Sequence, residues 1–322
     1  MDEPAAIRPD LVPVVAAVLR DRQGRVLLAQ RLPGKHLAGT WEFPGGKCEP
    51  GESAHQALAR ELAEELDIRI EASAPLLTLT HHYPEKSVRL MLREVPAWRG
   101  EPRGHEGQPL RWVSCAEMSE LPMPAADRPI CRALDLDPRY AISPDPALVG
   151  IDGLMNAWQD SLAAGFRLLQ LRAPSMPEDQ LLVLARHLGS IAREQGARWL
   201  LNGPVETAVG SGADGVHLSS RALAEFGERR RPEALLLAAS CHDARELDMA
   251  AAVGADFVCL SPVQHTASHP QASPLGWSGF ADLCAQSSLP VLALGGVAPE
   301  QLGQAREHGA WGVAGISAFG RR

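Results

Sequence analysis

The sequence predicts a two-domain protein of the α/β and α+β classes, because length, composition and a change in the rhythm of its apolar residues all indicate it. The chain has 322 residues, about twice the common size of one domain. Its hydrophobic content of 45% and charged content of 22% are typical of a globular protein with real cores. Within residues 1–136 strands and turns surround one helical stretch, whereas residues 137–322 alternate apolar strands with helices.

The first domain begins with two strand-like segments. Residues 12–20 and 26–31 are apolar runs joined by the turn DRQGR, which together predict a β-hairpin. Leu58, Leu62 and Leu66 recur at a spacing of four, so ALARELAEEL is expected to form an amphipathic helix. Three further strands are expected at residues 76–84, 87–95 and 110–114.

The second domain contains eight short apolar segments, with helical segments such as residues 178–195 and 244–254 between most of them. Near-continuous apolar strands are needed where both faces of a parallel sheet are buried, so this pattern predicts a (β/α)₈ (TIM) barrel. The proline-rich stretch DLDPRYAISPDP is typical of a domain junction. The expected strands are residues 139–143, 166–171, 198–202, 214–218, 235–240, 255–260, 290–296 and 311–317.

Charge and cysteine content restrict the partners. A formal net charge of −8 disfavours a nucleic-acid polymer, but metal ions can still bridge carboxylates to a single nucleotide. Six dispersed cysteines without a C-x-x-C pair favour free thiols over disulfides or a zinc site. The acidic N-terminus and the short apolar run after it are untypical of a signal peptide or membrane span, so we expect a cytoplasmic protein without a membrane partner.

The most informative segment is residues 46–68, which carries an acidic helix face. Glu61, Glu64 and Glu65 lie at positions i, i+3 and i+4, so their carboxylates share one side of the helix and repel one another. A hard divalent cation, Mg²⁺ or Mn²⁺, would resolve the conflict, because it prefers carboxylate oxygens and bridges them to phosphates. The preceding FPGGK loop allows its backbone to approach metal and phosphate closely.

This segment resembles the Nudix box, G-x5-E-x7-R-E-U-x-E-E-x-G-U, where U is an aliphatic residue. Every specified position matches except Asp67, which replaces a glycine that usually ends the helix in the left-handed conformation. Aspartate tolerates that conformation better than most residues, so we expect little damage to catalysis. The resemblance implies an α/β/α sandwich and hydrolysis of a nucleotide pyrophosphate bond.

The first domain is also similar to the MutT-type branch, the 8-oxo-dGTP diphosphatases, in TWEFPGGKCEPGE, WRGEPRGHEGQPLRWVS and LPMPAADRPI. In that branch water attacks the β-phosphorus, and a nucleoside monophosphate and pyrophosphate are released. The resemblance implies that Glu61 assists the water, that Arg60 holds the Glu61 carboxylate, and that Glu106 completes a metal or base role. The implied metal ligands are Gly45, Glu61, Glu64, Glu65 and Glu106. The implied substrate-binding residues are Arg31, Phe43, Gly46, Lys47 and Asp127.

Asp127 stands where the branch has a purine-reading asparagine. An amide both donates and accepts hydrogen bonds, whereas an ionised carboxylate only accepts them. Asp127 would accept the N7–H of 8-oxoguanine but would repel the neighbouring O6 unless it were protonated. Alternatively, Asp127 caps the helix expected from Arg128. The sequence therefore predicts the reaction and leaves the preferred base open.

The second domain resembles thiamine-phosphate synthase and its TenI relatives in LLQLRAP, LLNGPVETAVGSGADGVHLSS and PVLALGGVAPEQLGQAREHGAWGVAGISAF. The basic and acidic residues that read pyrophosphate and Mg²⁺ in the synthase are missing, and their positions hold Pro174, Gly203, Ala222 and His269. Without these charges a pyrophosphate leaving group cannot be ionised, so we do not expect synthesis of thiamine phosphate.

Backbone turns after the seventh and eighth expected strands persist in Gly295, Gly296, Ile316 and Ser317. This corner of a barrel commonly binds phosphate through backbone amides, so a phosphorylated ligand is one expectation; the other is that these residues only close the barrel. Three functions remain open for the whole chain. They are nucleotide-pool sanitation, hydrolysis of a thiamine-pathway pyrophosphate, and a ligand-binding barrel with a vestigial Nudix domain. The intact Arg60–Glu61 and Glu64–Glu65 pairs disfavour the third, and substrate preference alone separates the first two.

Overall fold

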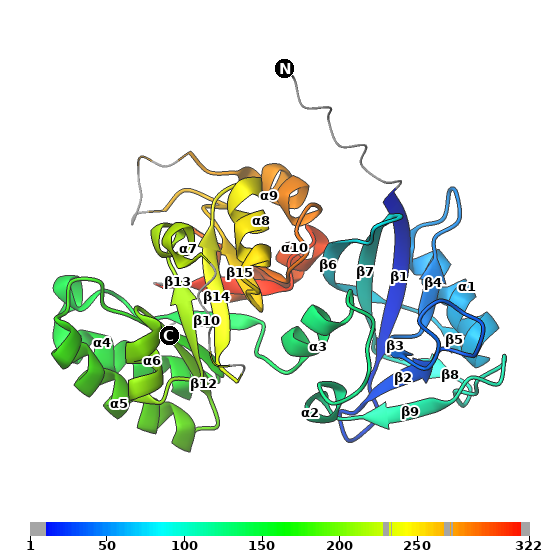
Figure 1. Cartoon of the computed structure of the whole chain (residues 1–322), viewed down its shortest axis with the longest axis horizontal. Coiled ribbons are helices and arrows are strands. Elements are labelled where there is room, and N and C mark those ends of the chain that lie inside the picture. Colours follow the sequence, from blue (N-terminus) through cyan, green and yellow to red (C-terminus); the bar gives the residue numbers. More distant parts are fainter. Residues whose placement is uncertain (1–10, 228–231, 233, 267–270, 272, 317–322) are drawn as a thin grey trace. The chain divides into compact units, whose positions relative to one another are not determined.

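The computed structural model of the chain describes residues 11–227, 232, 234–266, 271 and 273–316. The chain divides into two compact units, Met1–Asp135 and Leu136–Arg322 (Figure 1). The division lies one residue before the predicted junction. None of the helices in the described residues combines the length and the apolar character needed to cross a lipid bilayer.

Within residues 11–135, the described part of the first unit, three small sheets combine with three helices; Figure 1 shows their arrangement. One sheet has the order β4-β1-β7-β6, a second has the order β3-β2-β9, and β5 pairs with β8. In order along the chain the elements are β1 (Leu11–Leu19), β2 (Val26–Gln30), β3 (Trp41–Glu42), β4 (Gly45–Lys47), α1 (Ala54–Leu66), β5 (Arg69–Ile70), β6 (Ala74–His82), β7 (Ser87–Val95), β8 (Trp98–Arg99), β9 (Leu110–Val113), α2 (Cys115–Met118) and α3 (Arg128–Leu134).

The predicted hairpin between β1 and β2 is wrong in its pairing, although both strands and the turn are present. Gly24 takes a φ of 77° and its amide donates to the Asp21 carbonyl at 3.0 Å. Beyond this turn a single bridge, Arg20 with Val26, joins the strands in the described chain. β1 instead runs parallel to β7 along its whole length, whereas β2 pairs with β3 and β9. A local pattern predicts strands and turns but not distant partners.

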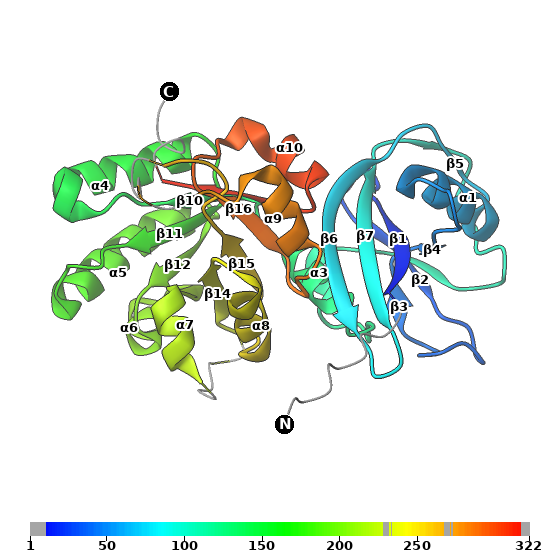
Figure 2. The same cartoon turned by 90° about the horizontal axis from the view of Figure 1, so that it is seen from above.

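Helix α1 forms where the leucine spacing predicts it. The Ser53 hydroxyl accepts a hydrogen bond from the Gln56 amide at 3.3 Å, and the Gln56 side chain accepts one from the Ser53 amide at 2.9 Å. The side chains of the leucine stripe are fully buried and pack with Val15, Ala17 and Leu19 of β1; α1 and β1 are labelled in Figure 2. Asp67 ends the helix with φ 55° and ψ 34°, the left-handed conformation for which the glycine of the Nudix pattern is suited. The expected tolerance of aspartate there is confirmed structurally.

The second unit is a closed barrel of eight parallel strands, β10 to β17 in order, with β17 pairing back to β10 (Figures 1 and 2). All eight predicted strands are present. In order along the chain the elements are β10 (Arg139–Ile142), α4 (Pro146–Ala163), β11 (Leu168–Arg172), α5 (Glu178–Glu194), β12 (Arg198–Asn202), α6 (Val205–Ser211), β13 (Gly215–Leu218), α7 (Ser220–Phe226), β14 (Leu236–Cys241), α8 (Ala244–Ala252), β15 (Phe257–Leu260), α9 (Gly276–Cys284), β16 (Val291–Leu294), η1 (Pro299–Gln301), α10 (Leu302–Glu307) and β17 (Gly312–Gly315).

Alternate strand residues divide between two layers of the barrel. One set packs against the helices, where Trp158 and Trp199 meet edge to face with ring centroids 6.3 Å apart. The other set points into the barrel, where Tyr140 meets Phe257 with centroids 5.5 Å apart. Gly189 in α5 is required by the outer layer, because a Cβ there would lie 2.7 Å from the Trp199 ring.

Candidate active site

A cavity of about 310 Å³ opens in the first unit between sheet, loops and the start of α3. Among the residues singled out from the sequence, its wall contains Arg31, Phe43, Gly45, Gly46, Lys47, Glu65 and Asp127. Arg60, Glu61 and Glu64 are outside this lining, and Glu106 lines a smaller neighbouring cavity. The structure therefore gathers all five of the expected substrate-binding residues around one space.

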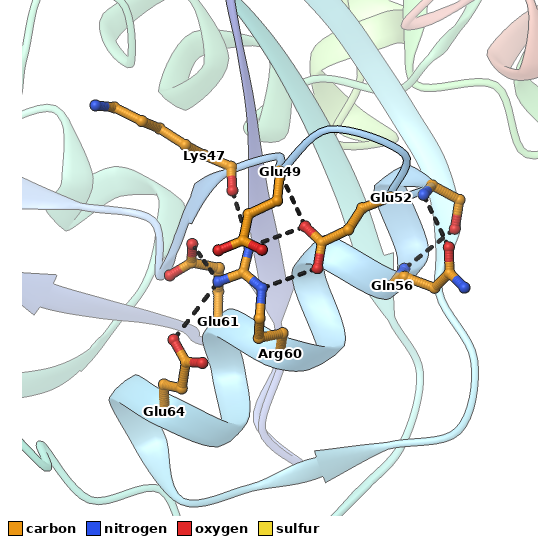
Figure 3. Close-up of polar contacts among 8 residues, drawn as sticks. Lys47, Glu49, Glu52, Gln56, Arg60, Glu61 and Glu64 are labelled. Atoms are coloured by element: carbon orange, nitrogen blue, oxygen red, sulfur yellow. Dashed lines mark hydrogen bonds and ion pairs between the residues drawn. The ribbon is translucent and has the colours of Figure 1, made fainter.

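Arg60 is the centre of a polar cluster beside the cavity (Figure 3). Its Nε and Nη2 donate to the two carboxylate oxygens of Glu52, each at 2.9 Å. Nη1 donates to Glu61 Oε1 at 2.9 Å, and Nη2 also donates to the Lys47 carbonyl at 3.0 Å. Glu64 is a looser partner at 3.5 Å. Such forked, charge-assisted contacts fix orientation, so the predicted contact between Arg60 and Glu61 holds the Glu61 carboxylate in place.

Glu52 anchors this cluster through the loop before α1. Its hydrogen bond with Arg60, reinforced by the Glu49 amide at 2.9 Å, lowers the pKa of Glu52 to about 2. Glu52 in turn is the largest cause of the raised pKa of Arg60. Both groups stay charged at any physiological pH, so the clamp on Glu61 does not depend on pH in that range.

Two glycines let the backbone approach the acidic helix. A Cβ on Gly46 would lie 2.3 Å from the Glu61 carboxyl carbon, so any side chain there would displace that carboxylate. A Cβ on Gly45, whose φ is 148°, would lie 2.2 Å from the Val15 carbonyl oxygen. At position 45 glycine is required, because the backbone of β1 lies too close for a larger residue; at position 46 a larger residue would fit only if the Glu61 carboxylate moved.

The three carboxylates of α1 do not share one environment. Glu61 is 16% exposed and lies against Arg60, whereas Glu64 is 62% exposed. Glu65 lines the cavity and accepts a hydrogen bond from the Gly45 amide at 3.2 Å. Burial raises the pKa of Glu65 to about 7; the Gly45 hydrogen bond opposes this, and the negative charges of Glu61, Glu42 and Glu106 add to it.

This accumulation of negative charge is what a divalent cation would neutralise, so the donor set fits Mg²⁺ or Mn²⁺ chemically. Within the described residues, however, no three His, Cys, Asp or Glu side chains stand close enough together to form a ready-made metal site. The carboxylates named from the sequence are each held by a donor of the protein instead: Glu61 and Glu64 by Arg60, Glu65 by Gly45, and Glu106 by Lys35.

The loop that carries Glu106 is tied to the end of α1. The Glu106 amide donates to Gln108 Oε1 at 2.9 Å, and Gln108 Nε2 donates to the Glu65 carbonyl at 2.9 Å. The Glu106 carboxylate forms an ion pair with Lys35, which is the main reason that the pKa of Lys35 is raised. Sequence reasoning missed Lys35 and Gln108, because both act through a partner far away along the chain.

Asp127 lines the same cavity and is 7% exposed. The alternative that it caps α3 is wrong, because its side chain makes no capping hydrogen bond although it occupies the cap position. Burial raises the pKa of Asp127 to about 7, with the negative charge of Glu42 adding to the shift and Arg31 opposing it. Sequence reasoning also missed Glu42, which pairs with Arg31 through two nitrogens, each at 2.7 Å.

The barrel turns named from the sequence have a packing role. Gly295 and Gly296 follow β16 with φ values of 96° and 71°. A Cβ on Gly295 would lie 2.8 Å from Pro262 Cα, and one on Gly296 would lie 2.7 Å from the His265 carbonyl oxygen. Glycine is therefore needed for contact with the neighbouring loop, whatever else binds there. Ile316 follows β17, and both Ser317 and His269 lie outside the described residues.

Gln170 and His217 belong to a chain of hydrogen bonds between buried side chains inside the barrel. Gln170 Nε2 donates to the Tyr140 hydroxyl at 3.2 Å, and that hydroxyl lies 3.3 Å from His217 Nδ1. His217 Nε2 lies 2.9 Å from the Ser240 hydroxyl. Burial lowers the pKa of His217 to about 3, so its ring is neutral and this network carries no net charge.

Comparisons with known proteins divide the chain at the same place. The family described as "NUDIX domain" matches residues 15–133, and the one described as "Thiamine monophosphate synthase" matches residues 140–319. The CTP pyrophosphohydrolase of Escherichia coli is 40% identical over 38% of this chain and 90% of its own length. The 8-oxo-dGTP diphosphatase of the same organism is 33% identical over 38% of this chain and 94% of its own. The thiamine-phosphate synthase of Laribacter hongkongensis is 38% identical over 54% of this chain and 84% of its own.

Proposed function

The chain belongs to the Nudix family through its first unit and to the thiamine monophosphate synthase family through its second, and from this we propose that the first unit is a Mg²⁺-dependent nucleoside triphosphate pyrophosphohydrolase. Its proposed substrate is 8-oxo-dGTP, cleaved to 8-oxo-dGMP and pyrophosphate. The observation that supports it best is the Glu61 carboxylate, which Arg60 holds against Gly46, a residue that lines the cavity of about 310 Å³.

In this proposal water attacks the β-phosphorus, the nucleoside monophosphate leaves, and the proton of the water passes to a carboxylate. Glu61 orients the water and accepts that proton, a role worth about 100-fold to 10,000-fold in rate. Arg60 keeps the Glu61 oxygens fixed, because its other contacts to Glu52 and the Lys47 carbonyl hold the guanidinium itself. Arg31, Lys47 and Lys86 supply positive charge on the cavity wall for the phosphates.

The proposed metal ligands are the Gly45 carbonyl and the carboxylates of Glu61, Glu64, Glu65 and Glu106. A bound Mg²⁺ or Mn²⁺ would neutralise the charge of these carboxylates and of the substrate phosphates. The raised pKa of Glu65, to which burial and the surrounding carboxylates contribute, supports this choice because it reflects negative charge that no side chain of the protein fully balances.

Asp127 is proposed to read the base. With a pKa of about 7 it is partly protonated near neutral pH, so it can donate to O6 of 8-oxoguanine and accept its N7–H. The same residue favours CTP as a second candidate substrate, since an ionised carboxylate accepts a hydrogen bond from the exocyclic amine of cytosine. The choice between the two depends on the protonation state of Asp127 with nucleotide bound.

The test is steady-state hydrolysis of 8-oxo-dGTP, dGTP, CTP and thiamine diphosphate with Mg²⁺, scoring monophosphate, pyrophosphate and inorganic phosphate. We expect 8-oxo-dGTP to have the highest kcat/KM and Glu61→Gln to lower kcat by about 100-fold or more. Glu49→Gln is the matched control, because Glu49 is an exposed carboxylate on the adjoining loop. A preference for CTP or thiamine diphosphate would overturn the proposed substrate. Equal rates for Glu61→Gln and wild type would overturn the proposed role of Glu61.

For the second unit we propose a barrel without synthase turnover that binds a phosphorylated ligand. The neutral residues Pro174, Gly203 and Ala222 support the lack of turnover, because they supply no charge to a pyrophosphate leaving group. Titration of inorganic phosphate and pyrophosphate into the full chain, followed by thermal unfolding of the barrel, tests the binding. Formation of thiamine phosphate by the wild-type chain would overturn the first part of this proposal.

A further inference from the structure

Lysine is rare in this chain and confined to one place. Among 31 basic residues only Lys35, Lys47 and Lys86 are lysines, and all three line the cavity of the first unit. An ammonium group on a flexible stem can change partners, whereas the rigid fork of an arginine suits one fixed geometry. The arginines of this site do hold such fixed pairs, so the lysines are the cations that are free to move.

Lys35 differs from the other two lysines in having an acidic partner. Its ammonium pairs with Glu106, although the two residues are 71 positions apart in the sequence. Lys47 and Lys86 have no ion pair within the described residues. The Lys35 side chain is 52% exposed and that of Glu106 is 49% exposed, so water weakens their attraction and the pair can open at low cost.

The loop that carries Lys35 is fixed at its base. The Arg31 amide donates to the Thr40 carbonyl and the Gly39 amide donates to the Arg31 carbonyl, each at 2.9 Å. The Arg31 guanidinium also donates to the His36 carbonyl at 2.7 Å. A change of partner by Lys35 therefore needs only rotation of its own side chain and leaves the backbone of the loop in place.

Lys35 also contributes to the walls of two neighbouring cavities. It lines both the main cavity and the smaller one that contains Glu106. The residues common to both linings are Arg31, Lys35, Glu42, Phe43 and Glu65. Of the two cations in this set, Arg31 is held by Glu42, so Lys35 is the one able to pair with an acidic group in either space.

We propose that Lys35 is an internal counter-ion, which holds Glu106 in the free protein and passes to the substrate phosphates when a divalent cation takes Glu106. The proposal rests on the proposed function in one respect, that Glu106 belongs to the metal ligands. An oxygen paired with an ammonium is a poorer ligand for a divalent cation, so Lys35 and the metal compete for Glu106. The phosphates of a nucleotide relieve the competition, because they offer Lys35 another anion.

If Lys35 exchanges partners in this way, its removal should change the affinity for a divalent cation and the affinity for the nucleotide in opposite directions. Removing the ammonium of Lys35 strengthens binding of a divalent cation alone, since the competitor is gone. The same change weakens binding of the nucleotide, since a phosphate contact is lost. A residue that merely braced its loop would weaken both when removed, and a general effect of positive charge would be the same for Lys35 as for Lys86.

The experiment is calorimetric titration of Mn²⁺ into the full chain without nucleotide. We expect Lys35→Met to lower the dissociation constant of Mn²⁺ by about two- to five-fold, the range for an exposed ion pair, and Lys86→Met to leave it unchanged. In a Glu106→Gln background Lys35→Met is expected to have no effect on Mn²⁺. Lys35→Met is also expected to raise the KM for the nucleotide more than it changes kcat, and Lys35→Arg to restore the KM.

Two results would overturn the proposal. One is weaker Mn²⁺ binding by Lys35→Met than by wild type, and the other is an equal gain in affinity for Lys35→Met and Lys86→Met. Circular dichroism of each variant checks that the fold is kept. If the wild-type chain hydrolyses no nucleotide while Lys35→Met still binds Mn²⁺ more tightly, the counter-ion role stands and the proposed function fails, so the two failures are distinguishable.

Discussion

The two units differ in where their polar side chains lie and in whether those side chains are charged. The cavity of the first unit collects all three lysines and several carboxylates around an open space, and burial and neighbouring negative charges raise the pKa values of Glu65 and Asp127. The barrel buries a chain of neutral partners, with His217 as its titratable member. Both folds persist, because each depends on the periodicity of apolar residues rather than on charge. The difference separates a unit whose charged side chains surround an open cavity from a unit whose buried polar side chains are neutral.

The largest expected effect is on the rate of nucleotide hydrolysis, and it distinguishes Gly46 of the first unit from Gly303 of the second. Gly46→Ala places a Cβ on the Glu61 carboxylate and is expected to lower kcat/KM by about 100-fold, the scale of a 1 Å misplacement in an active site. Gly303→Ala in α10 is the control, since a Cβ there meets nothing within 4 Å. The measurement is nucleotide hydrolysis. Equal rates for the two variants would show that the position of Glu61 does not limit the reaction.

The next effect concerns stability of the barrel. His217→Ala removes the partner of Tyr140 and Ser240 and leaves a cavity, so we expect the free energy of unfolding to fall by about 2–3 kcal/mol. His187→Ala, on the exposed face of α5, is the control and is expected to cost less than about 0.5 kcal/mol. Chemical denaturation measures both, and hydrolysis in the first unit is expected to stay at the wild-type rate. Two equal, small losses would contradict a structural role for the buried network.

A smaller effect appears in the pH dependence of stability. Asp127 has its pKa raised to about 7 in the fold, so between pH 4 and 7 the native state holds a proton that the unfolded chain has lost. Stability therefore falls as pH rises through this window. The groups facing Asp127 are Arg31, Glu42, Tyr83 and Cys131.

Asp127→Asn removes this titration. We expect the variant to gain stability over wild type between pH 5 and pH 8, by about 1–2 kcal/mol after allowance for solvent relaxation. Denaturation of the two proteins at a series of pH values measures the gain. A difference that did not change with pH would show that Asp127 is already ionised at pH 5.

His217 has the opposite effect on the pH dependence of stability. Because its pKa is lowered in the fold, the barrel loses stability as pH falls below about 6.5.

The smallest expected effect is at the end of α1. Asp67→Gly relieves the left-handed backbone of an L-residue and is expected to stabilise the first unit by about 0.5–1 kcal/mol, with hydrolysis unchanged. Asp67→Ala keeps the steric conflict and is the control. Thermal unfolding measures both. A lower midpoint for Asp67→Gly than for wild type would mean that the Asp67 side chain stabilises the helix end in another way.

Periodic signals predicted most of the fold. The leucine stripe at Leu58, Leu62 and Leu66 placed α1, and eight apolar runs placed the barrel strands. The pairing of β1 was beyond such signals, because its partner β7 is brought alongside by the collapse of the whole unit. The hairpin expected with β2 is therefore the part of the fold that sequence reasoning got wrong.

The residues of the candidate site divide in the same way, into those that a local sequence pattern predicts and those that depend on a partner distant in the sequence. Arg60, Glu61 and Gly46 were predictable because they occupy specified positions of the Nudix box, and the structure brings the three together. Lys35 and Glu42 were not, since each gains its role from a partner on another loop or strand. The burial of Asp127 was likewise hidden, because a polar residue before a helix usually caps it.

The confinement of lysine to one cavity has a practical consequence for chemistry on this protein. Side-chain amines occur at Lys35, Lys47 and Lys86 and nowhere else in the sequence. Dyes, biotin reagents and surfaces that couple through amines will therefore react either at the amino terminus or at the mouth of this cavity. A label on any of the three lysines would therefore add its bulk to the wall of this cavity.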